Sequence, residues 1–221
     1  MFLGHFAVGF AAKRVAPRVS ITALLIAAMF LDVLWPVFLW LGIESVRIDP
    51  GNTAFTPLDV VRYPYSHSLV MALAWSVLFA GLYRGMTRDR TGAVWVGICV
   101  LSHWVLDGIT HRADLPLFPW DGPKVGLGLW NSVTATAGTE IAMSIAGLLL
   151  YLSATRARNW AGHLSLWSLV AVLAFFYGGT VRGDVPPGED AIKLMMTLLI
   201  LVMLAWFTWI DRTREPRTSR P

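Results

Sequence analysis

Six apolar segments, each close to the length that crosses a lipid bilayer, constrain this chain more than any other feature. About 20 apolar residues in a helix span the hydrocarbon core, and a helix satisfies its own backbone hydrogen bonds there. The segments are Val19–Leu41, Ser66–Tyr83, Gly92–Thr110, Val133–Ser153, Trp160–Val181 and Ala191–Ile210. We therefore predict an all-α polytopic membrane protein with about six transmembrane helices.

The composition supports this class and excludes others. Of the 221 residues, 56% are hydrophobic and only 14% are charged, which is typical of a membrane protein and not of a soluble domain. The net charge is +4, but the basic residues form no stripe of the kind that binds nucleic acid. The single Cys99 excludes an intrachain disulfide and a cysteine-based zinc site.

The loops between the segments are too short for a soluble domain. We expect residues 1–210 to form one integral-membrane domain and residues 211–221 to form a basic, disordered cytoplasmic tail. Twelve of the 18 Lys and Arg residues fall on the side that carries both ends of the chain. By the positive-inside rule that side, with the N- and C-terminal segments, is cytoplasmic.

The segment Phe2–Ala16 has two readings. It is apolar, too short to span, and ends before Pro17. It could lie on the cytoplasmic surface as an amphipathic helix. It could instead be a re-entrant half-helix that descends to Lys13, turns, and packs on the first span through Gly4 and Gly9. Only the second reading brings His5 into the membrane, and we favour it.

The stretch Ser102–Asp107 carries the most specific chemical signal. His103 and Asp107 are four residues apart and therefore share one face of a helix. Such a pair can hold one metal ion. Ionisable residues inside a membrane are costly and usually functional. The alternative is an interhelical hydrogen bond or a buried ion pair.

Five ionisable residues fall into one layer when depth is counted at about 1.5 Å per helical residue. His103 lies about 18 Å from the cytoplasmic end of its span, and the others lie about 21 to 25 Å from theirs. These others are Asp32, His67, Asp107 and Glu140. His5 lies at about 13 Å if its segment is re-entrant. The agreement predicts a shared site in the outward half of the membrane.

Histidine with carboxylate, without thiolate, suits a divalent metal such as Zn²⁺, Mn²⁺ or Fe²⁺. We expect zinc, as one or two ions, with His5, Asp32, His67, His103 and Asp107 as ligands. An open coordination position would lower the pKa of bound water to about 7. Glu140 or Asp107 is then the candidate catalytic base.

The loop His111–Ser132 alternates Pro and Gly with large apolar residues and is too apolar for a solvated linker. We expect it to lie at the outer interface and roof the site, although a plain interfacial loop would look the same. Three cations near it, Arg62, Arg112 and Lys124, are candidates for binding an anionic head group or phosphate. His111 lies eight residues after His103, on the same face if the helix continues, and is a candidate lid or supporting residue.

Four motifs together resemble a known family. They are His5 in a Gly-flanked N-terminal segment, Asp32 followed by Pro36, Ser66-His67-Ser68, and Ser102-His103-x-x-x-Asp107. This order resembles the YdjM-like inner-membrane proteins, described as metal-dependent hydrolases. It is more distantly similar to the zinc-dependent phospholipase C and single-strand nuclease group. The resemblance covers about the first 110 residues and implies a bacterial inner-membrane location.

Two departures from these patterns matter. The soluble group has a further His-x-x-x-Glu pair, where this chain has Thr136-x-x-x-Glu140, which argues against three metals. The YdjM-like proteins have Pro-Asp where this chain has Leu31-Asp32. The resemblance implies hydrolysis of a phosphoester or lipid-like substrate, with membrane lipid as partner and no nucleic acid. The alternatives are a proton- or ion-coupled transporter and a non-catalytic membrane scaffold.

Overall fold

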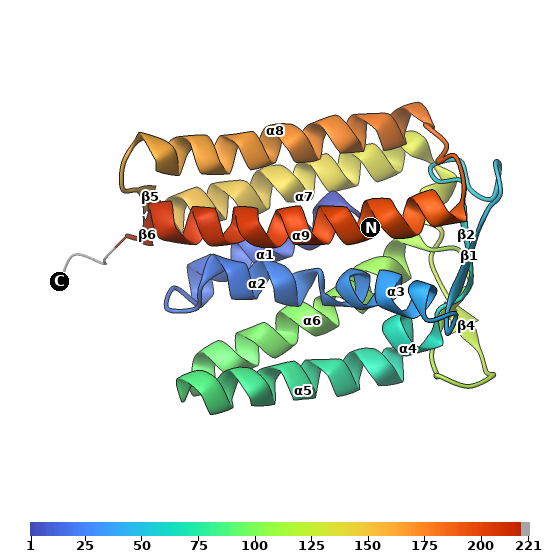
Figure 1. Ribbon diagram of the computed structural model, residues 1–221, viewed down its shortest axis with the longest axis horizontal. Helices are drawn as coiled ribbons and strands as arrows, with labels where there is room; N and C mark the ends of the chain where they lie inside the picture. The colour runs from blue at the N-terminus through green and yellow to red at the C-terminus, as the bar shows by residue number, and fades with distance from the viewer. Residues whose placement is uncertain (218–221) are drawn as a thin grey trace.

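The computed structural model describes residues 1–217, which form a helical bundle with a small cap at one end (Figure 1). The helices are α1 Leu3–Val15, α2 Ile21–Ala28, α3 Phe30–Trp40, α4 Pro64–His67, α5 Leu69–Thr87, α6 Arg90–Thr110, α7 Val133–Ala154, α8 Trp160–Arg182 and α9 Glu189–Thr213. Helices α5 to α9 are each long and apolar enough to cross a membrane, and the bent pair α2–α3 is a sixth candidate when its two helices are taken as one broken span. The predicted all-α polytopic fold is confirmed.

The first span is broken into two helices that bend by 57°. The break lies at Met29, where the backbone leaves helical geometry, well before Pro36. A break frees carbonyl groups that a continuous helix would use. Here the freed oxygen belongs to Ala28, and it lies 2.8 Å from Nδ1 of His103 on α6.

Helix α1 lies inside the bundle, between α7 on one side and α2 and α6 on the other (Figure 1). Two glycines allow this close approach. A Cβ atom at Gly147 of α7 would lie 2.4 Å from the carbonyl oxygen of Ala7, and one at Gly9 would lie 2.7 Å from Leu25. The segment is therefore an internal half-length helix, as the re-entrant reading expects, and it carries His5 into the interior.

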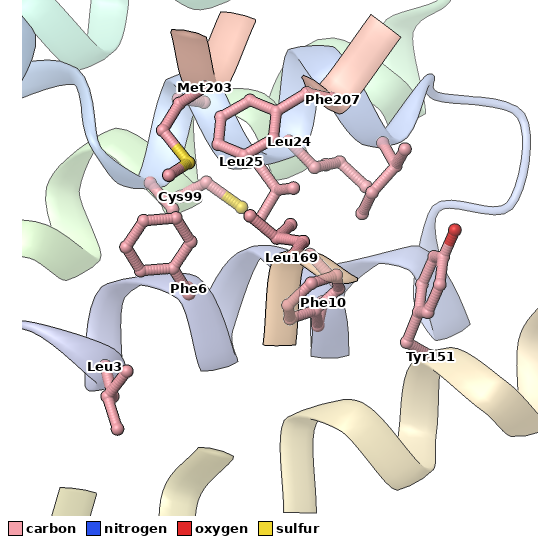
Figure 2. Close-up of a cluster of buried hydrophobic side chains, with 14 of the residues drawn as sticks. Leu3, Phe6, Phe10, Leu24, Leu25, Cys99, Tyr151, Leu169, Met203 and Phe207 are labelled. Carbon is pink, nitrogen blue, oxygen red and sulfur yellow. The ribbon is translucent and has the colours of Figure 1, made fainter. Parts of the chain in front are cut away.

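Apolar side chains from α1, α2, α6, α7, α8 and α9 form one core (Figure 2). Phe6 and Phe10 of α1 lie at its centre, among Leu24 and Leu25 of α2 and Cys99 of α6. On α6 its buried members precede His103, and the core extends from there past the cluster to Phe55 of the cap. Burial of these side chains is the main force that holds the half-helix in place.

Short antiparallel strand pairs close the two ends. The strands are β1 Ser45–Ile48, β2 Leu58–Arg62, β3 Leu115–Pro116, β4 Lys124–Val125, β5 Thr155–Ala157 and β6 Arg214–Pro216. Strand β1 pairs with β2, β3 with β4, and β5 with β6. We call residues 42–68 and 111–132 the cap; it holds β1 to β4, α4 and the one-turn helix η1, Leu129–Asn131. The pair β5–β6 lies at the opposite end (Figure 1).

The segment that follows the last span differs from the expected disordered tail. Asp211 accepts hydrogen bonds from the backbone N–H groups of Ile21 and Thr22, both at 2.9 Å, and so caps α2. Arg214 is 6% exposed and donates to the carbonyl of Gly162 and to the hydroxyl of Thr155. These contacts order residues 211–217; residues 218–221 of the predicted tail lie outside the described residues.

Candidate metal centre

Four helices bring five of the predicted residues to one place beneath the cap. His5 comes from α1, Asp32 from α3, His67 from α4, and His103 and Asp107 from α6. His5, His103 and Asp107 form one group whose ligand atoms lie within 4.8 Å of one another, and Asp32, His67 and His103 form a second. The two groups share His103. We call the five residues the His/Asp cluster.

Asp107 lies at the centre of the cluster. Its Oδ1 is 3.2 Å from Nε2 of His5, and its Oδ2 is 3.2 Å from Nε2 of His103 and 3.7 Å from Nε2 of His67. The amino nitrogen of Met1 is 2.6 Å from Oδ1. Asp107 is 2% exposed, so its charge needs these cationic or polar neighbours.

Asp32 is the more open carboxylate of the cluster. Its Oδ1 lies 3.5 Å from Nε2 of His67 and 3.7 Å from Nε2 of His103. The Asp32 side chain is 22% exposed, whereas that of His103 is fully buried. Because Asp32 and His67 also line the adjoining cavity, this side of the cluster is reachable by water and by a ligand.

The hydrogen bond to Ala28 fixes the tautomer of His103. A carbonyl oxygen only accepts, so Nδ1 carries a proton, and in the neutral ring Nε2 presents a lone pair. That Nε2 is buried and finds no hydrogen-bond partner within residues 1–217, although carboxylate oxygens of Asp107 and Asp32 face it. Lone pairs that converge in this way repel one another unless a cation lies between them, so the geometry suits either a proton on Nε2, which makes a buried ion pair, or a metal ion.

A similar chain of hydrogen bonds orients His67. Its Nδ1 lies 2.7 Å from Oγ of Ser66, and that hydroxyl donates to Oε2 of Glu44 at 2.6 Å. Since the hydroxyl proton goes to the carboxylate, the Ser66 oxygen accepts from Nδ1, and Nε2 of His67 is left to bind a cation. Metal-binding histidines typically have such carboxylate-linked partners.

Glu44 is held in turn by the backbone. Its Oε1 accepts from the N–H groups of Tyr65 and Ser66, both at 2.8 Å. Burial raises the pKa of Glu44, and these hydrogen bonds oppose the shift. No spacing in the sequence links Glu44 to Ser66, because the β1–β2 hairpin separates them. This supporting pair was therefore missed at the level of sequence.

Glu140 lies beside the cluster but faces the start of α1. Its Oε2 accepts from the backbone N–H groups of Phe2, Leu3 and Gly4, at 3.0, 2.5 and 3.4 Å. A carboxylate at a helix N-terminus satisfies free N–H groups and interacts favourably with the helix dipole. The depth predicted for Glu140 agrees with this place, and its hydrogen bonds make it a residue that positions α1.

A cavity of about 950 Å³ adjoins the cluster. Asp32, His67 and Asp107 line one part of it, and the β1–β2 hairpin and Trp130 roof it. Most of its remaining wall comes from apolar side chains of α8 and α9, with Phe2 and Trp35 beside the cluster. The expectation that the loop 111–132 covers the site agrees with the position of Trp130. The β1–β2 hairpin forms the larger part of the roof, and no pattern in the sequence predicts this.

His111 also lines this cavity, next to the cluster. Its Nδ1 lies 3.0 Å from Oδ1 of Asp114 and 3.2 Å from Oη of Tyr63. Asp114 is partly buried, which alone would raise its pKa, but hydrogen bonds from His111 and Arg112 outweigh burial and lower it. Asp114 is thus a stable anionic partner for the imidazole.

The three predicted substrate-binding cations lie elsewhere on the cap. Arg112 is paired with Asp59 at 2.8 Å and with Asp114 at 2.9 Å. Arg62 and Lys124 are exposed on β2 and β4. The arginine that lines the cavity is Arg182, at the end of α8. A role of the first three in binding substrate stays a prediction.

Comparison with known families places the chain in one of them. The model of the family described as YdjM inner membrane protein matches residues 1–184, which include the whole His/Asp cluster and all of α8. Searches of curated proteins and of solved structures find no match.

Proposed function

The chain belongs to the YdjM inner membrane protein family and is an integral membrane protein of the all-α class. From this premise we propose that it is a membrane-embedded, metal-dependent hydrolase of a phosphoester or ester in a lipid-like substrate. The observation that carries the proposal is the pair of metal-ligand groups that share His103.

The donor set fits one or two divalent cations, with zinc as the first candidate. Neutral histidine nitrogen and carboxylate oxygen are preferred zinc ligands, and a central carboxylate such as Asp107 is able to bridge two ions. His103 has one free lone pair, at Nε2, so it would bind a single ion, in either group. If two ions are held, Asp107 would be the bridging ligand, because its Oδ1 faces His5 and its Oδ2 faces His103 and His67. When bound, such an ion acts as a Lewis acid toward the ester and activates water.

The other residues of the site have separable roles. The hydrogen bonds of His67 to Ser66 and of His103 to Ala28 keep both Nε2 atoms directed at the cluster. The imidazole of His111, paired with Asp114 and lining the cavity, is placed to exchange a proton with the leaving group. Glu140 anchors α1 and thereby His5. The roof of the cap and the apolar walls limit entry of bulk water.

An enzyme accounts for the packing better than a transporter does. Tightly packed apolar residues fill the bundle between the cluster and the β5–β6 end, among them Leu24, Leu25, Val96 and Cys99. A transport path needs polar groups on both sides of its site. The excess of Lys and Arg on the side of the β5–β6 end indicates that this end is cytoplasmic, so the cluster faces the outer half of the membrane.

The proposal is tested by metal analysis of detergent-purified protein. We expect wild type to retain a divalent metal after extensive washing. The His103→Ala/Asp107→Ala variant should lose it together with any phosphoesterase activity, because it removes the ligand shared by both groups and the central carboxylate. His163→Ala is the matched control, since His163 is an exposed histidine on α8 away from the cluster. Metal-free wild type from metal-replete cells would refute the proposal.

The same preparation tests the part played by Glu140. If Glu140 only positions α1, Glu140→Gln keeps an acceptor oxygen for the α1 N–H groups and should retain metal and most activity. If Glu140 is the general base, the variant should retain metal and lose activity by a factor of about 10² to 10⁴. We expect the first result.

A further inference from the structure

The cavity beside the His/Asp cluster does not end at the polar groups. It continues between α8 and α9, where its walls come from Val172 and Phe176 of α8 and from Leu199 and Met203 of α9. Met203 is only 5% exposed, so this part reaches well into the bundle. A small polar substrate would not need such an extension.

The extension opens sideways, on the surface formed by two of the spanning helices. Phe175, Leu198 and Val202 line the cavity and are 72%, 52% and 52% exposed. In a spanning helix such side chains face lipid. Charged groups line the cavity in two places: the cluster, and Arg182 with Asp184 3.3 Å away at the cap end of α8. The cavity therefore joins a polar site to the hydrocarbon of the membrane.

We propose that this extension is a binding site for the acyl chain of a membrane phospholipid. The chain enters between α8 and α9, and the polar part of the same molecule reaches the cluster. An amphiphile satisfies both ends: its chain buries the apolar walls, and its ester or phosphate group meets the polar residues. As an assignment of substrate the inference rests on the proposed function, whereas occupation of the cavity by lipid does not.

The test uses a phospholipid with a photoactivatable diazirine near the end of one acyl chain, present at trace level in nanodiscs that hold the full-length protein. After irradiation, the modified residues are mapped by mass spectrometry. We expect labelling of Leu199 and Met203, which face the cavity, in addition to labelling of outward residues such as Leu201 by bulk lipid. Labelling confined to outward residues would overturn the proposal.

A matched pair of substitutions on α9 sharpens the result. Leu198→Trp places a larger side chain at the cavity mouth, whereas Leu201→Trp places it at an exposed position, 60% accessible, outside the cavity lining. Leu198→Trp should reduce labelling of Met203 severalfold relative to labelling of Leu204. Leu201→Trp should leave that ratio unchanged. Equal ratios in both variants would contradict an acyl chain in the cavity. A second copy of the protein that covers Met203 and blocks its labelling would contradict it too.

A further arm separates this inference from the proposed function. The His103→Ala variant is expected to lose metal and still show labelling of Met203, because its substitution lies at the polar end of the cavity. Wild type that lacks metal but labels at Met203 would refute the hydrolase and leave the acyl-chain site standing. Wild type that holds metal without labelling at Met203 would refute the acyl-chain site alone.

Discussion

At the scale of single residues, the cluster depends on hydrogen bonds that the ligands make on their other side. His103 is oriented by a backbone carbonyl, and His67 by the chain through Ser66 to Glu44. An imidazole without such a partner can rotate or change tautomer, and either event turns the lone pair away from the ion. The supporting residues therefore matter almost as much as the ligands.

Ser66→Ala tests this support without touching a ligand. It removes the acceptor for Nδ1 of His67 and leaves Glu44 without its hydroxyl donor, so we expect metal affinity to fall by about 10- to 100-fold. Affinity is measured by competition with a chelator of known affinity. Ser76→Ala is the control, because Ser76 makes a similar hydrogen bond, 2.7 Å to the carbonyl of Gly97, away from the cluster. Equal affinities in the two variants would contradict the role of Ser66.

At the scale of elements, α1 is the part that turns a helical bundle into a site. It is only 13 residues long and cannot span the membrane, yet it carries His5 to the cluster. The ring of His5 stacks on that of His103 with centroids 3.6 Å apart. Its position is set by close packing on α7 and by the hydrogen bonds of Glu140 to its first turn. Glu140 meets the residues just before His5, and Gly147 meets Ala7 just after it, so the two contacts fix the depth of His5.

Two glycine-to-alanine changes in α7 should have opposite effects on stability. In Gly147→Ala the new methyl group meets the backbone of Ala7 at 2.4 Å and forces α1 away, which should cost about 1–3 kcal/mol. In Gly138→Ala the methyl group meets open space, so the higher helix propensity of Ala should add up to about 1 kcal/mol. Unfolding in detergent measures both. If Gly147→Ala proves as stable as Gly138→Ala, α1 does not pack as described.

At the scale of the whole molecule, the two ends of the bundle differ. One carries the cap, the cluster and the mouth of the cavity, and the other is closed by apolar core and by the β5–β6 pair. In the described structure the cavity thus lies beside the cluster and reaches exposed side chains of α8 and α9. This asymmetry suits a reaction at one membrane face better than passage through the membrane.

The orientation is tested with single cysteines in a Cys99→Ala background. Asp121→Cys reports on the cap, and Met86→Cys reports on the end of α5 near the opposite face; both positions are exposed. A membrane-impermeant maleimide applied to intact cells with a permeable outer membrane should label Asp121→Cys and leave Met86→Cys unlabelled until the inner membrane is lysed. The reverse pattern would place the cluster on the cytoplasmic side.

The spanning helices and most of the cluster can be predicted from the sequence. Apolar length fixes where helices cross a bilayer, and the cost of ionisable groups there makes Asp32, His67, His103 and Asp107 conspicuous at a common depth. Tertiary structure decided what depends on contacts between distant segments. It placed α1 inside the bundle, turned Glu140 toward the N–H groups of that helix, and set Glu44 behind His67. It also formed the cavity between α8 and α9, since apolar residues that face lipid and those that face a cavity look alike in a sequence. Depth along a helix follows from residue number, whereas the direction of a side chain across a bundle follows only from the packing of its neighbours.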